Sequence, residues 1–273
     1  MSADRLAACF ARCNEEGRSA LIGYLTAGDP NPEISGKALC ALAEYVDIIE
    51  IGMPFSDPMA DGPVIQAASE RALAAGTHVD DVFRLTAQVR TARPEIGIVL
   101  MGYANVPYAM GFEHFAARAA EAGADGVLIV DIPPEESAIC DTALATHGLH
   151  NIRLLSPTSS DERIRLAVTH AGGFVYYVSL TGITGADMGR VEDIRRKLAS
   201  IRQYTDLPVC VGFGVKTPEQ ARKVVEFADG VVIGSHFVMQ VTENMADSSA
   251  IVKAVSRQAQ SMREAVVKAV QGE

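Results

Sequence analysis

Two acidic side chains lie where they could carry out acid–base chemistry. Glu50 stands in an apolar, β-branched run over residues 46–51, and Asp61 follows eleven residues later at the end of a Gly/Pro-rich loop. Glutamate is almost never fully buried without a partner, so its presence in such a strand is not explained by simple packing. One acid on a rigid strand and another on a loop is a plausible proton-transfer pair. The structural alternative is that Glu50 is paired in the core and Asp61 caps the helix that begins near Pro63.

Three glycine-rich stretches in the second half of the chain could hold an anion. They lie at residues 181–185, 212–214 and 234–235. Glycine lets backbone N–H groups approach a phosphate closely. Barrel enzymes often bind phosphate with the loops after strands seven and eight and a short extra helix, for which residues 235–240 are a candidate. One Gly-x-Gly is usually only a tight turn, but three such stretches at consecutive strand ends favour a phosphate site.

Alternating strands and helices must position these residues. The predicted strands are 20–25, 46–51, 96–103, 126–130, 152–155, 174–179, 208–213 and 230–233. The predicted helices are 3–16, 32–44, 63–75, 79–91, 112–122, 134–147, 161–170, 191–204, 218–227 and 248–270. Strand–helix alternation implies parallel pairing, and eight such units predict an α/β fold, a (β/α)8 TIM barrel with an extra N-terminal helix, as one domain over residues 1–273.

Two further features favour the barrel. The similar segments 124–130 and 228–234 would open strands four and eight, as in a barrel built from two like halves. The alternative, an open doubly wound sheet, would usually have a nucleotide-binding loop after its first strand, and residues 26–30 do not form one.

The ends of the strands and their following loops form the active face of a barrel. Side chains alternate along a strand, so Ile49 and Ile51 are expected to face the helices and Glu50 the barrel mouth. Asp131, at the end of the fourth strand, is expected to have a supporting role. An apolar, partly aromatic pocket is predicted from Tyr24, Met101, Tyr103, Leu128 and Tyr176, although core filling is the usual role of each of these residues singly.

Composition excludes several classes of function. The net charge is −10 and the basic residues are scattered, which argues against nucleic-acid binding. No apolar run approaches the roughly 20 residues of a membrane span. The five cysteines are scattered and fit reduced thiols in a cytoplasmic protein. The six histidines do not converge, so no metal site is predicted. Lys216 alone among the lysines follows a strand end, where a surface or phosphate-side role is expected rather than imine chemistry.

The segment 49–63, Ile-Glu-Ile-Gly-Met-Pro-Phe-Ser-Asp-Pro-Met-Ala-Asp-Gly-Pro, closely resembles the α subunit of the tryptophan synthase family. The resemblance spans nearly the whole chain and continues through 26–30, 103–105, 130–136, 182–185, 212–214 and 234–235. It implies a lyase of tryptophan biosynthesis that cleaves indole-3-glycerol phosphate to indole and glyceraldehyde 3-phosphate. Glu50 would then move protons and Asp61 would hold the indole N–H.

The resemblance also assigns the rest of the site. It places the phosphate contacts at Gly185, Gly214, Gly234 and Ser235. It places pocket residues at Tyr24, Tyr103, Tyr176 and Thr184. The chain itself would need no cofactor.

The same resemblance implies a partner, a β subunit that carries pyridoxal phosphate, in an αββα heterotetramer through which indole passes between the sites. The loops 52–62 and 180–189 would be mobile covers. One departure is Leu180-Thr181, where some members carry Arg-Ala, and this affects any loop or interface contact through that arginine, not the chemistry.

Two other hypotheses remain. Another phosphate-binding barrel, such as an indole-glycerol-phosphate synthase or a pentose-phosphate epimerase, would want strand-end lysines or metal ligands, and the sequence offers neither. A phosphate-ligand sensor without catalysis would not need a carboxylate in its mouth, so the retention of both Glu50 and Asp61 argues against it.

Overall fold

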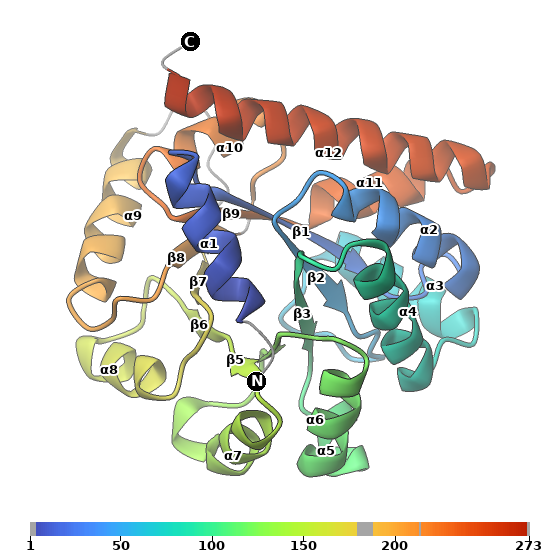
Figure 1. The fold of residues 1–273 in the computed structure, drawn as a ribbon, viewed down its shortest axis with the longest axis horizontal. Coiled ribbons are helices and arrows are strands. Elements are labelled where there is room, and N and C mark those ends of the chain that lie inside the picture. Colours follow the sequence, from blue (N-terminus) through green and yellow to red (C-terminus); the bar gives the residue numbers. More distant parts are fainter. Residues whose placement is uncertain (1–3, 179–187, 213, 272–273) are drawn as a thin grey trace.

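The computed structural model describes residues 4–178, 188–212 and 214–271. Its strands form one parallel sheet in the order β5-β4-β3-β2-β1-β9-β8-β7-β6, curled into a barrel with the helices outside it (Figure 1). The strands are β1 (Ala20–Thr26), β2 (Ile48–Gly52), β3 (Gly97–Gly102), β4 (Gly126–Ile129), β5 (His150–Asn151), β6 (Arg153–Leu155), β7 (Val175–Val178), β8 (Val209–Gly212) and β9 (Gly230–Ile233). The predicted barrel is confirmed.

The fifth predicted strand is divided in two. β5 pairs with β4 and β6 pairs with β7, and Ile152 between them donates its N–H to the carbonyl of Val127 at 2.9 Å. The two short pieces therefore occupy the place of one strand, and the sheet has nine assigned strands in the described residues instead of eight.

The helices follow the predicted order with two differences. They are α1 (Arg5–Glu15), α2 (Pro32–Ala43), α3 (Pro63–Ala74), α4 (Val79–Ala92), α5 (Asn105–Met110), α6 (Phe112–Glu121), α7 (Ala138–Thr146), α8 (Asp161–Thr169), α9 (Met188–Ile201), α10 (Pro218–Val225), α11 (Ser235–Glu243) and α12 (Ser248–Gln271). The short helix α5 was not predicted. The helix predicted from Pro134 begins only at Ala138, because a separate 3-10 turn occupies Pro134–Glu136.

Helix α1 closes the amino-terminal end of the barrel, away from the predicted site. Its carboxylate cap Asp4 accepts from the N–H of Ala7 at 3.0 Å. The buried side chains of α1 pack against the inward-facing side chains of the strands. The buried residues of this helix are Leu6, Cys9, Phe10 and Cys13. Figure 1 shows α1 lying across the ring of strands. Packed side chains therefore fill the amino-terminal end of the barrel, and the predicted site lies at the carboxyl ends of the strands.

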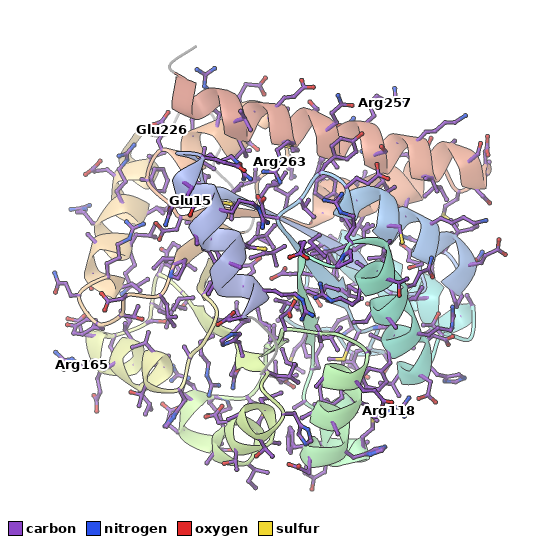
Figure 2. The ribbon with its side chains drawn as sticks, viewed as in Figure 1. Glu15, Arg118, Arg165, Glu226, Arg257 and Arg263 are labelled. Atoms are coloured by element: carbon purple, nitrogen blue, oxygen red, sulfur yellow. The ribbon has the colours of Figure 1, made fainter. Side chains whose placement is uncertain are left out.

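Three aspartates in equivalent positions stabilise the amino-terminal end of the barrel. Asp47, Asp125 and Asp229 each directly precede a strand, and each accepts a backbone N–H from a neighbouring strand. These donors are Leu21 at 2.9 Å, Ile98 at 2.8 Å and Val209 at 2.7 Å. Asp47 is also held by Arg18 and by Arg263, which reaches in from α12 (Figure 2). The similarity of segments 124–130 and 228–234 therefore includes this shared backbone contact.

The alternation predicted for β2 is confirmed. Ile49 and Ile51 are fully buried in the layer between the strands and the outer helices, whereas Glu50 lines a cavity inside the barrel. None of the helices in the described part of the chain is long and apolar enough to cross a membrane.

Candidate active site

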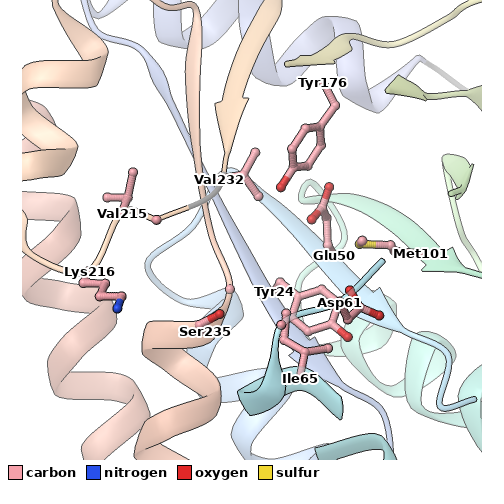
Figure 3. A pocket seen from close by; sticks show the side chains of 13 residues that line it. Tyr24, Glu50, Asp61, Ile65, Met101, Tyr176, Val215, Lys216, Val232 and Ser235 are labelled. Atoms are coloured by element: carbon pink, nitrogen blue, oxygen red, sulfur yellow. The ribbon is translucent and has the colours of Figure 1, made fainter. Parts of the chain in front are cut away.

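A cavity of about 210 Å³ opens at the carboxyl ends of the strands. Strands β1, β2, β3, β7 and β9 and the turns after β8 and β9 contribute its wall, and Figure 3 shows the side chains pointing into it. The lining residues are Tyr24, Glu50, Asp61, Gly62, Ile65, Met101, Tyr176, Gly214, Val215, Lys216, Val232, Gly234 and Ser235. Glu50 and Asp61, eleven residues apart in the sequence, thus face one space.

Glu50 is held in an unusual electrostatic state. Its side chain is 1% exposed, and neither carboxyl oxygen has a hydrogen-bond partner among the described residues. Burial without a partner disfavours the charged form. It raises the pKa of Glu50 from 4.5 to about 8. The alternative that Glu50 is paired in the core is therefore wrong, and at neutral pH the group is a protonated acid able to give up its proton.

Two tyrosines flank this acid, and two glycines make room for them. Any side chain at Gly52 would overlap the ring of Tyr24, and one at Gly212 would overlap the ring of Tyr176. The hydroxyl of Tyr24 lies 3.2 Å from that of Thr26. Both rings are buried, and burial keeps their pKa values well above 10, so both hydroxyls stay neutral beside Glu50.

Asp61 is positioned by contacts on both of its sides. The hydroxyl of Tyr103 donates to the Asp61 carboxylate at 3.0 Å and accepts the N–H of Ala60 at 3.0 Å. The side chain of Gln66 donates to the Asp61 carbonyl at 2.9 Å. Burial raises the pKa of Asp61, and the hydrogen bond from Tyr103 lowers it. The alternative role as a helix cap is wrong, because Gly62 is the N-cap of α3 and no side chain caps that helix.

Replacing Tyr103 by Phe is expected to lower kcat/KM by roughly tenfold to a hundredfold, since a hydrogen bond to a charged group contributes about 1.5–3 kcal/mol. The loss of this bond also raises the pKa of Asp61, so the acidic limb of the pH–rate profile should move to higher pH. Tyr45→Phe, at a half-buried tyrosine of the outer layer, is the control. An unmoved acidic limb would show that Tyr103 does not tune Asp61.

A second cavity of about 400 Å³ adjoins the first and shares Asp61, Met101 and Tyr176 with it. Most of its other walls are apolar or weakly polar. They are formed by Ala60, Val130, Leu154, Leu155, Ser156, Ser159, Arg163 and Val178. Together the two cavities give a site with an apolar end beyond Asp61 and a polar end beyond Glu50.

The polar end lies at two glycine turns. Gly214 has a positive φ of 81°, and Gly234 is the N-cap of α11, which begins at Ser235. No side chain caps this helix. Among the described residues the backbone N–H groups of Ser235 and His236 have no hydrogen-bond acceptor, whereas those of Phe237 and Val238 donate to the carbonyl of Gly234 at 2.9 and 3.2 Å. Such a helix start attracts anions. Thr184 and Gly185, also predicted for the site, lie outside the described residues, as does the loop around Leu180.

Other predicted residues have different placements. Leu128 is fully buried in the core layer inside the barrel and does not line either cavity. Asp131 does not reach either cavity, and its carboxylate accepts the N–H of Ala104, next to Tyr103, at 2.8 Å. Three wall residues, Ile65, Leu154 and Val232, are not among those predicted from the sequence. Of these, Leu154 and Val232 stand at inward positions near strand ends, a signal that was available. In the part of the chain that is described, no three His, Cys, Asp or Glu side chains are grouped to hold a metal ion.

The raised pKa of Glu50 makes stability depend on pH. The folded state keeps the proton that the unfolded state loses, so this group's contribution is complete below its unfolded pKa of 4.5 and is lost as pH rises through about 8. Each unit of pKa difference corresponds to about 1.4 kcal/mol. We expect Glu50→Gln to unfold at higher denaturant concentration than the wild type at pH 8, with a smaller difference at pH 5. Equal midpoints at both pH values would mean that Glu50 is not held protonated.

The comparisons with known proteins agree with this geometry. Residues 10–267 match the family model described as tryptophan synthase alpha chain. The tryptophan synthase alpha chain of Zymomonas mobilis is 47% identical over 258 residues, which cover 93% of this chain and 94% of the relative. That of Geobacter sulfurreducens is 50% identical over 235 residues, covering 86% and 89%.

Solved structures give the same result. Tryptophan synthase subunit alpha from Legionella pneumophila superposes with a TM-score of 0.87 at 39% identity, covering 96% of this chain and 98% of that one. A chain of tryptophan synthase from Mycobacterium tuberculosis superposes with a TM-score of 0.86 at 33% identity, again covering 96% and 98%.

Proposed function

This chain belongs to the tryptophan synthase alpha chain family, and on that basis we propose that Glu50 and Asp61 are its catalytic residues. The family cleaves indole-3-glycerol phosphate to indole and glyceraldehyde 3-phosphate and passes indole to the β subunit, and this is the activity of the chain. The observation that carries the proposal is a buried Glu50, without a hydrogen-bond partner among the described residues, in the same cavity as Asp61.

The reaction needs a proton at one carbon and the loss of another proton nearby. Indole is a poor leaving group until its C3 is protonated, and protonation moves positive charge to the ring nitrogen. The bond from C3 to the glycerol carbon then breaks, its electron pair returns to the ring, and the hydroxyl on that carbon loses its proton to become an aldehyde. In this proposal, Glu50 gives the first proton and, once ionised, accepts the second, so it ends the cycle unchanged.

The surroundings of Glu50 suit both steps. A pKa of about 8 lies close to neutral pH, where a group is effective both as an acid and as a base. Its neighbours Tyr24 and Tyr176 offer no charge that would hold it ionised. An unpaired acid in an apolar environment is costly for stability, which is a reason to assign it to the chemistry.

Asp61 would stabilise the charge that develops on the indole ring. Its carboxylate is fixed by Tyr103 at the boundary of the two cavities, where the apolar walls around Met101, Leu154 and Tyr176 can hold a flat ring. A carboxylate that accepts the indole N–H becomes a stronger partner as the nitrogen becomes positive. Asp61 therefore contributes more in the transition state than in the bound substrate.

The phosphate group would bind at the opposite end of the cavity. We place it at Gly214, Gly234 and Ser235, where a glycine turn and the uncapped start of α11 offer N–H groups. Gly185 and Thr184 are proposed to complete this end. The substrate would then span the cavity from its phosphate at α11 to its indole ring beyond Asp61.

The assembly and location are further proposals. The chain works with a β subunit. We propose that the two form an αββα heterotetramer, that the β subunit carries pyridoxal phosphate, and that the enzyme is cytoplasmic. We also propose that residues 1–273 form one domain. The family membership and the single barrel sheet support these statements.

Indole release from indole-3-glycerol phosphate, measured with and without a tryptophan synthase β subunit, tests the partnership. Slow release that rises sharply when the β subunit is added would support the proposal. No release in either condition from a folded chain would instead favour a phosphate-ligand sensor.

A further inference from the structure

The negative charge of a bound phosphate group needs a positive partner in the proposed site. A phosphate monoester carries nearly two negative charges, and the cavity already contains the acidic Asp61 and also Glu50, which becomes negative once it has given up its proton. Backbone N–H groups supply only partial positive charge. Among the described residues that line this first cavity, Lys216 is the one with a full positive charge, because Arg163 lines the second cavity, beyond Asp61.

We propose that Lys216 is a phosphate-binding residue of this chain, which pairs its ammonium group with the substrate phosphate beside Ser235. The inference rests on the phosphate subsite proposed above and adds a side-chain cation to its backbone donors. Figure 3 shows Lys216 and Ser235 on one side of the cavity and the carboxyl groups of Glu50 and Asp61 on the other. The charges of the site are thereby divided between its two ends.

The backbone of Lys216 is held in place at the cavity rim. Its N–H donates to the side chain of Gln220 at 2.7 Å. Gln220 also closes the capping box of α10 with Thr217, the next residue along the chain. On the other side, Val215 is 4% exposed and packs in the core. The start of the side chain therefore has a fixed position, and only its methylene chain is free to move.

The ammonium group is available for a ligand. No acidic side chain in the described residues forms a salt bridge with Lys216, whereas the exposed Lys37 pairs with Glu33 at 2.8 Å. The side chain of Lys216 is exposed, so its attraction to phosphate is screened by salt. The same exposure allows the side chain to reach the ligand without a desolvation cost as large as that of a buried cation.

The test compares variants by their affinity for glycerol 3-phosphate, measured by calorimetry on the full chain at low and high ionic strength. Lys216→Met should weaken binding about three- to tenfold at low salt, and the difference should shrink at high salt. Lys216→Arg should retain most of the affinity. Lys223→Met, which removes one exposed positive charge from α10, is the matched control and should bind as the wild type does.

The outcomes separate this inference from the function on which it rests. If Lys216→Met and Lys223→Met bind glycerol 3-phosphate equally well while the wild type binds it, Lys216 has no role at the phosphate and the subsite remains. If the wild type releases indole but does not bind glycerol 3-phosphate at low salt, the proposed phosphate subsite itself is wrong. If Lys216→Met also weakened the binding of free indole, which has no phosphate, the substitution would be acting on the structure of the site. That result would also contradict the inference.

Discussion

Replacing Glu50 by Gln is expected to lower the rate of indole release by about 10²–10⁴-fold, the usual contribution of a general acid–base group. Glutamine has nearly the same shape as a protonated glutamic acid, and Glu50 makes no hydrogen bond in the described structure that the change would break. The fold and the binding of substrate should therefore be kept. The loss should appear in kcat and kcat/KM together, with little change in KM.

The control for this variant is Glu70→Gln, which makes the same change on the exposed surface of α3. It should release indole at the wild-type rate. Near-normal indole release from Glu50→Gln would remove Glu50 from proton transfer, because no amide side chain can give and accept a proton at neutral pH.

The second large effect is expected at Asp61. Asp61→Asn should lower indole release by about 10²–10³-fold, the loss typical when one electrostatic stabiliser of a developing charge is removed. An asparagine keeps the size of the side chain and can still accept from Tyr103, but it provides no negative charge for the ring nitrogen. The measurement is kcat/KM for indole-3-glycerol phosphate at neutral pH.

The role assigned to Asp61 also predicts which part of the ligand is affected. Binding of glycerol 3-phosphate, which has no ring, should be unchanged in Asp61→Asn, because the proposed phosphate subsite is at the other end of the cavity. If this indole-free ligand lost as much affinity as the full substrate, Asp61 would be acting on the phosphate or on the fold, and its assignment to the ring would fail.

The position of the proposed catalytic Glu50 could be predicted from the sequence for a physical reason. A carboxylate in an apolar strand breaks the local pattern, and the alternation of β2 fixes its direction, so the sequence alone predicts that Glu50 faces the barrel interior. The glycine turns at Gly214 and Gly234 were also visible, because the strand count put them at the ends of strands seven and eight.

Side-chain contacts between segments that are distant in the sequence could not be predicted from it. Nothing in the spacing shows that Tyr103 bonds Asp61 across 42 residues, or that Asp131 holds the adjacent Ala104. Leu128 was predicted to line the pocket, but it lies in the core layer inside the barrel and on the wall of neither cavity. The alternation along a strand predicts that a side chain points into the barrel, but not how deep it lies. The depth of the side chain along the barrel axis depends on the register of all the strands.

The proposed role of Glu50 as a proton donor is tested most directly by measuring its protonation state in the folded chain. Infrared difference spectra between the wild type and Glu50→Gln would isolate the carbonyl stretch of one protonated carboxylic acid. We expect this band at pH 7 and its loss as pH rises through about 8. A band that is already absent at pH 7, with a carboxylate signal in its place, would show that Glu50 is ionised at rest and would contradict its role as the acid that protonates indole.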